Sequence, residues 1–117
     1  MDVISADEGE LLEFFQVEPQ RCDANVPWPY NGLRYEVRRG DFALSFAVAP
    51  AEKDVQVRLQ VGSATIYELT ATRVEDVRYH ADKPHHQALE IIVSTRERLW
   101  LRLKPSIGII HEVAEHT

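Results

Sequence analysis

Four side chains of the types that bind metal ions lie close together in the sequence: His80, Asp82, His85 and His86. Imidazole nitrogens and carboxylate oxygens are ligands for zinc, which takes several of them in a fixed geometry. The spacing matches none of the usual zinc motifs, and the adjacent His85 and His86 would point to opposite sides of an extended segment. We therefore expect no bound metal and no other cofactor, and we keep a histidine-based metal protein or enzyme as an alternative.

Other catalytic patterns are missing from the sequence. The glycines are scattered, so no glycine-rich loop is available to bind phosphate. No nucleophile elbow is present, and the adjacent carboxylates of Glu75 and Asp76 would face opposite ways in a strand. The single cysteine, Cys22, lies between Arg21 and Asp23, whose opposite charges give no clear activation of its thiol. With no nucleophile beside a base, the sequence favours a protein that is not an enzyme.

The residues that favour protein binding lie toward the C-terminus, in a predicted hairpin. A three-residue loop over 95–97 would place Ile92 opposite Trp100 on one face of this hairpin, next to Arg98 and Arg102. Aromatic and arginine side chains are enriched at protein interfaces. The alternative is that an N-terminal helix covers Trp100, since an amphipathic helix must bury its apolar stripe.

A second candidate binding segment holds two aromatic residues between prolines, Pro27-Trp28-Pro29-Tyr30. Proline fixes the backbone on either side of Trp28, so Trp28 and Tyr30 would form a stiff contact surface. Aromatic side chains in such a segment also close the open end of a barrel or sandwich. The sequence leaves both roles open.

The elements that must position these side chains are strands, because apolar and polar residues alternate in several runs between Leu33 and His111. Successive strand residues point to opposite faces, so each run provides one buried face. Parallel sheets need long crossover helices and show continuous apolar runs, which indicates an antiparallel arrangement here. The sequence predicts a mainly β fold, a sandwich or a flattened, partly open barrel of about eight strands with one short N-terminal helix.

The first hairpin can be aligned from the sequence alone. A two-residue turn at 40–41 places Tyr35 opposite Phe46, so that apolar residues pair with each other. The opposite face of the second strand carries small side chains, against which the N-terminal helix is expected to pack: Ala43, Ser45, Ala47 and Ala49.

The later strands are predicted in the same way, by aligning apolar residues across a turn of stated length. A three-residue loop at 62–64 places Leu59 opposite Tyr67 in the second hairpin. Residues 72–80 fit either a helix or a strand, and we favour a strand. Further strands are predicted over 87–94, 98–104 and 106–112.

The segment Ser5–Gln16 is predicted to form the helix. Ser5 and Glu8 have the spacing of a capping box, in which each side chain accepts a hydrogen bond from the backbone N–H of the other residue. The apolar stripe expected to dock on the sheet consists of Leu11, Leu12 and Phe15.

The chain of 117 residues is expected to form a single domain, with an acidic helix and connector over 1–32 and the β region over 33–112. Residues 1–25 hold seven acidic residues and one basic residue, so the whole net charge of −6 lies in this segment. An acidic chain argues against nucleic acid as the partner, because phosphate binding needs a basic patch. No signal peptide or membrane-spanning run is visible, and one cysteine cannot form an internal disulfide. We therefore expect a cytoplasmic protein that does not bind membranes.

These features predict a non-catalytic protein-binding or regulatory domain. An immunity or inhibitor protein that docks on a basic partner is its concrete form, with the acidic helix speeding the encounter. The candidate contact residues are Ile92, Trp100, Arg98, Arg102, Trp28 and Tyr30. The partner is another protein or a second copy of the chain, and the alternative function is a small-ligand-binding β barrel with the two N-terminal aromatic residues at its mouth.

Overall fold

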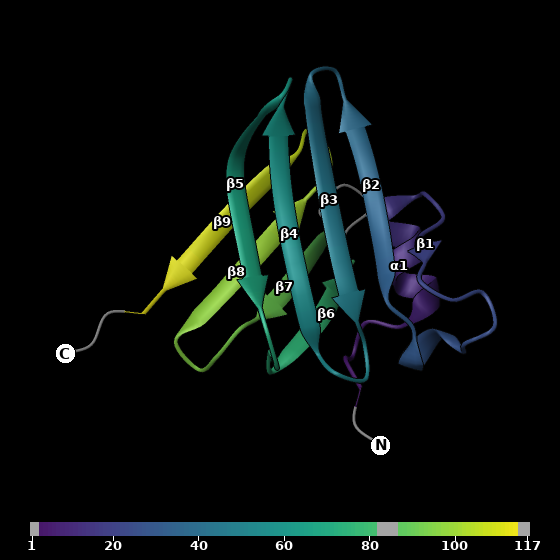
Figure 1. Cartoon of the computed structure of the whole chain (residues 1–117). Coiled ribbons are helices and arrows are strands. Elements are labelled where there is room, and N and C mark those ends of the chain that lie inside the picture. Colours follow the sequence, from purple (N-terminus) through teal and green to yellow (C-terminus); the bar gives the residue numbers. More distant parts are fainter. Residues whose placement is uncertain (1–2, 82–86, 115–117) are drawn as a thin grey trace.

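The residues that the structure describes, 3–81 and 87–114, form one short α-helix, one 3-10 turn and nine strands (Figure 1). Neither helix in this part of the chain is long and apolar enough to cross a membrane. In chain order the elements are α1 Glu8–Phe15, β1 Gln20–Arg21, η1 Trp28–Tyr30, β2 Leu33–Arg39, β3 Phe42–Ala49, β4 Asp54–Val61, β5 Ala64–Ala71, β6 Asp76–His80, β7 Ala88–Ile92, β8 Glu97–Arg102 and β9 Gly108–Val113.

Two antiparallel sheets pack face to face around one apolar core in the computed structural model of the chain (Figure 1). The first sheet has the order β1-β2-β3-β4-β5 and the second has the order β6-β7-β8-β9. Each sheet is therefore a meander, in which neighbouring strands are consecutive in the sequence. The predicted mainly β, antiparallel fold with one N-terminal helix is confirmed, and of the two architectures considered the chain adopts the sandwich.

The first hairpin of the five-stranded sheet has the predicted register. Tyr35 pairs with Phe46, and Gly40 in the turn has a φ of 60°, a left-handed conformation that favours glycine. The alternation of apolar residues and the length of the turn agree with each other, so only one register buries the apolar face.

The second hairpin has the predicted register for a different reason. Leu59 pairs with Tyr67 as expected, but Val61 pairs with Ala64, so the turn itself has only two residues. The extra residue is Ile66, which lies in a bulge between the pairs on either side and is 56% exposed. A bulge shifts the register by one residue just as a longer loop would, so the sequence could not distinguish the two.

The predicted register of the late hairpin is wrong by two residues. Trp100 lies opposite Glu90, and Ile92 lies opposite Arg98. The loop does have three residues, but it spans 94–96, because the Val93 backbone N–H donates to the Glu97 carbonyl at 2.9 Å. A slip of two residues leaves every side chain on its predicted face, since the strand period is two.

The uncertain stretch 72–80 crosses from one sheet to the other and then forms a strand. The Val74 N–H donates to the Lys53 carbonyl in the first sheet's loop, and the Glu75 N–H donates to the Ile92 carbonyl in the second sheet. The strand β6 begins at the next residue, so the preference for a strand is confirmed from 76 to 80.

The helix begins later than predicted, and its cap is different. Asp7 is the N-cap, and it forms a capping box with Glu10. The predicted capping box between Ser5 and Glu8 is therefore wrong. Ser5 cannot cap the helix because its side chain and backbone N–H both donate to the carboxylate of Asp76. The residues before the helix therefore run along the edge of β6, where the Ala6 N–H donates to the Val77 carbonyl.

The helix seals one edge of the sandwich instead of covering a sheet face. α1 contacts β2 in one sheet and β6 in the other, and it buries Leu11, Phe14 and Phe15, whereas Leu12 is 39% exposed. The Phe15 ring stacks on Tyr35 at 4.8 Å between centroids and on Phe46 at 5.3 Å. The predicted stripe was wrong at Leu12, because the helix presents its aromatic pair to a gap between sheets rather than to a flat surface.

The face of small residues on β3 is left uncovered by the helix. Ala47 and Ala49 instead border a shallow groove of about 470 Å³ on the outer side of the five-stranded sheet, with Arg34, Gln56 and Thr70 around it. The expectation that the helix packs there is therefore wrong.

We expect Phe15→Ala to lower the free energy of unfolding by about 3–5 kcal/mol, because it removes a buried ring and leaves a cavity between the sheets. Leu12→Ala on the same helix is the matched control, and it should lower stability by only about 1 kcal/mol, because Leu12 is 39% exposed and its loss leaves no cavity between the sheets. Urea denaturation of the two variants measures both values. Equal losses would contradict the role of the helix as an edge seal.

Candidate functional site

The outer face of the four-stranded sheet gathers aromatic, arginine and carboxylate side chains. The inward residues of β6, β7 and β8 are buried in the core, so the alternate residues of these strands point outward. We call this surface the arginine–tryptophan face, and its residues are Asp76, Arg78, His80, Glu90, Ile92, Arg98, Trp100, Arg102, Ile110 and Glu112.

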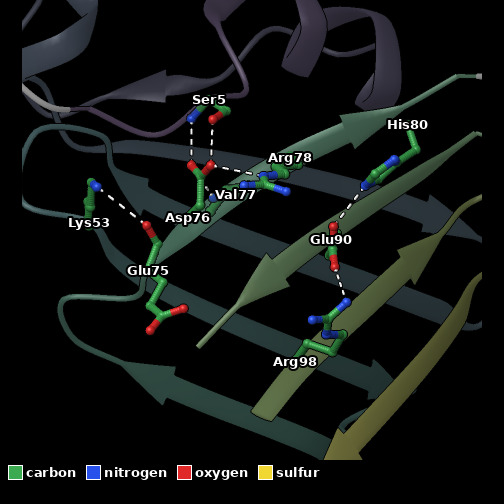
Figure 2. Close-up of polar contacts among 9 residues, drawn as sticks. All are labelled: Ser5, Lys53, Glu75, Asp76, Val77, Arg78, His80, Glu90 and Arg98. Atoms are coloured by element: carbon green, nitrogen blue, oxygen red, sulfur yellow. Dashed lines mark hydrogen bonds and ion pairs between the residues drawn. The ribbon is translucent and has the colours of Figure 1, made fainter. Parts of the chain in front are cut away.

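A buried carboxylate organises the centre of this face. Glu90 is only 4% exposed, and its two oxygens accept from different residues (Figure 2). The Nε2 atom of His80 lies 2.8 Å from Oε1, and Nη1 of Arg98 donates to Oε2 at 2.7 Å. A carboxylate removed from water needs such charged or polar partners, so Glu90 fixes both side chains on the sheet surface.

Trp100 lies beside this network and is half-buried. Its Nε1 donates to Oε1 of Glu112 at 2.5 Å, and its ring centroid is 5.3 Å from that of His80. On the sheet it lies between Glu90 and Ile110 on the neighbouring strands. The indole is therefore held in one orientation with part of its surface in solvent.

The structure brings together the candidate contact residues of the late hairpin. Trp100 and its flanking residues Arg98 and Arg102 share one face of β8, and Ile92 lies next to Arg98 on β7. The alternative, in which the N-terminal helix covers Trp100, is wrong because α1 contacts β2 and β6 at the edge of the sandwich.

The two N-terminal aromatic candidates lie elsewhere and have different environments. Trp28 belongs to the core and is only 8% exposed, so its ring is buried and does not form the predicted contact surface. Burial raises the pKa of Tyr35, and the neighbouring Trp28 indole partly opposes this shift. Tyr30 is 57% exposed, so Pro29 separates one buried ring from one solvated ring.

The histidine-rich segment is only partly described. His80 is bound by Glu90, whereas Asp82, His85 and His86 lie outside the described residues. Within residues 3–81 and 87–114, no group of three or more histidine, cysteine, aspartate or glutamate side chains is placed to hold a metal ion.

Sequence reasoning missed the importance of Glu90. The sequence did contain a sign of it, because an acidic residue is unusual inside an apolar run such as Ala88-Leu89-Glu90-Ile91-Ile92. A carboxylate among apolar residues of a strand needs a hydrogen-bonding partner nearby. The slipped register of the late hairpin hid Arg98, one of the two diagonal neighbours that bind Glu90.

Asp76, at the edge of the same face, is also held by several donors (Figure 2). Burial acts to raise its pKa, but the hydroxyl and backbone N–H of Ser5, together with Arg78 and the Val77 N–H, outweigh it and lower the pKa below its usual value. The ionised carboxylate therefore ties the N-terminal segment to β6.

The lowered pKa of Asp76 predicts a pH dependence of stability. A depressed carboxyl pKa contributes stability above the unfolded-state value of about 3.9, and that contribution is lost as pH falls through the folded-state value. We expect Asp76→Asn to be less stable than the wild type at neutral pH, with a difference that shrinks below about pH 4. Urea denaturation across this range tests it, with Glu52→Gln in an exposed loop as the control, which should show a constant difference.

Removing the arginine that pairs with Glu90 should also cost stability. In Arg98→Met the carboxylate keeps only His80 as a side-chain partner among the described residues, and we expect a loss of about 1–3 kcal/mol in the free energy of unfolding. Arg102→Met, which changes an exposed arginine on the same strand, should alter stability by no more than about 0.5 kcal/mol. Similar losses of stability in the two variants would show that the ion pair between Arg98 and Glu90 does not contribute to the free energy of unfolding.

The fold is thus an antiparallel β-sandwich of two meanders whose edge is sealed by a helix. No family model matches the sequence, and no curated protein matches it. Among solved structures, the chain is similar to a chain of a contact-dependent growth inhibition toxin–immunity protein complex from Klebsiella pneumoniae 342. The TM-score is 0.73 at 18% identity, over 91% of this chain and 92% of that chain. At this identity the comparison shows a shared fold.

Proposed function

We propose that this protein is a non-catalytic binding protein of the immunity type, which docks on a protein partner through the arginine–tryptophan face. The observation that carries the proposal is Trp100, a half-buried indole on a sheet face that the helix leaves uncovered. Tryptophan and arginine are the side chains most enriched at the energetic centres of interfaces. The shared fold with a chain of a toxin–immunity complex supports the same class of function.

The interior of the sandwich favours this proposal over the small-ligand barrel. Large side chains fill the space between the sheets, where Phe15 stacks on both Tyr35 and Phe46. A ligand-binding barrel instead needs an open interior. Binding is therefore assigned to the surface.

The acidic N-terminal segment supports a basic partner. Residues 1–25 contain the whole net charge of −6, and Glu8, Glu10 and Glu13 lie on α1, which is at the opposite edge of the sandwich from β9 (Figure 1). Charge of this kind acts over a distance and raises the rate of encounter, while the contacts that hold the complex lie on the arginine–tryptophan face. We expect this binding to take place in the cytoplasm.

We expect Trp100→Ala to weaken partner binding at least about 30-fold, the effect of losing about 2 kcal/mol at an interface centre. Affinity capture from the host lysate identifies the partner, and calorimetry with the purified partner measures the dissociation constant. The matched control is Ile66→Ala, because Ile66 is a strongly exposed apolar residue on the other sheet. All proteins must first show the same thermal midpoint.

An immunity function adds a second requirement. The captured partner should inhibit growth when expressed alone, and co-expression of the wild type, but not of Trp100→Ala, should restore growth. A partner that binds the wild type and Trp100→Ala equally well would contradict the proposal that the arginine–tryptophan face is the docking surface. A partner without any effect on growth would contradict the immunity class.

A further inference from the structure

The carboxylates of the arginine–tryptophan face are already bound by donors of this chain. Asp76 accepts from Ser5, Val77 and Arg78, while Glu90 accepts from His80 and Arg98 (Figure 2). The third carboxylate, that of Glu112, accepts from the Trp100 indole. Each acidic group on this face therefore already accepts at least one hydrogen bond from its own neighbours.

The arginines of the same face keep donors that the chain does not use. Arg98 donates to Glu90 through Nη1, and its side chain remains 44% exposed. Arg102 is exposed and makes no hydrogen bond or ion pair with any residue that the structure describes. A guanidinium presents several N–H groups in one plane, so both side chains can still bind an acceptor from outside.

The donors of Arg98 are also fixed in position before any partner arrives. Its contact with Glu90 is an ion pair at 2.7 Å, and the Glu90 side chain is only 5% exposed. Because the buried carboxylate is anchored in β7, the guanidinium is held at the sheet surface within the same face as Trp100. Holding a side chain in place in this way lowers the entropy lost on binding.

We propose that the arginine–tryptophan face recognises an aspartate or glutamate side chain of the partner that lies next to an apolar side chain. The inference rests on the proposed function and names the chemistry of its contact. The partner's carboxylate would pair with the free donors of Arg98 or of Arg102, which flank Trp100 on β8, and the neighbouring apolar group would pack on Trp100 and Ile110. Guanidinium and carboxylate fit each other because both are planar and offer two parallel hydrogen bonds.

Charge complementarity favours a protein carboxylate over a nucleic acid phosphate. The face alternates arginines with carboxylates, and the whole chain has a net charge of −6. A phosphate backbone requires a continuous basic track, which such alternation interrupts. A single carboxylate at the end of a side chain needs only the local donors.

A random-peptide display library selected on the immobilised full chain tests this inference without knowledge of the partner. We expect the enriched peptides to contain an acidic residue adjacent to an aromatic or aliphatic one. Their dissociation constants should rise about 10- to 100-fold in Arg98→Gln, in line with the loss of a hydrogen bond to a charged group. Arg38→Gln is the control, because Arg38 is an exposed arginine on the outer face of the other sheet, and binding should not change.

Three outcomes would overturn the inference: no peptide enriched above background, enriched peptides without acidic residues, or binding that Arg98→Gln and Arg102→Gln leave unchanged. A short single-stranded oligonucleotide that binds the wild type and is lost in the same variants would replace it with phosphate recognition. A failure of the carboxylate inference can be distinguished from a failure of the proposed function. If a captured partner is lost with Trp100→Ala while no acidic peptide binds, only the carboxylate contact is wrong.

Discussion

Each sheet of this sandwich has one apolar face, and these faces are stable only when they are covered along their whole width. The two sheets cover each other in the middle, but the space between β2 and β6 would remain open to water. Phe14 and Phe15 close it, and the stacking of Phe15 on Tyr35 and Phe46 joins the helix to the core of the first sheet. This burial gives the short helix its stability, because eight residues would not remain helical alone.

The position of the helix also determines which surfaces are available for binding. With α1 in the gap between the sheets, the outer face of the four-stranded sheet stays open, and Trp100 remains partly in solvent. The helix carries its acidic side chains at the opposite edge from β9. The fold thereby places the acidic side chains of α1 and the arginines of β8, Arg98 and Arg102, on different parts of the sandwich.

The period of two in the sequence was sufficient to predict the antiparallel β class and the face on which each strand residue lies, but not to choose the sandwich over the barrel. It placed Tyr35 opposite Phe46 correctly and gathered Arg98, Trp100 and Arg102 on one surface. It could not distinguish a longer loop from the bulge at Ile66, because both add one residue to the same strand. It also could not exclude a slip of two residues, since such a slip preserves both faces. The buried network at Glu90 depended on that register, and the helix cap depended on Asp76 binding Ser5 from far along the chain, so neither was accessible to local reasoning.

The bulge at Ile66 has a consequence beyond the register. β5 and β9 are the outer strands at one side of their sheets, and such edges can pair with another chain and start aggregation. The extra residue interrupts the regular row of backbone groups along β5, while Tyr67 beside it reaches across to His111 on β9 at 3.0 Å. The two edge strands are thus joined by a side-chain contact. A second copy of this chain would find an irregular edge on β5, which pairs less readily than a flat strand and so disfavours polymerisation.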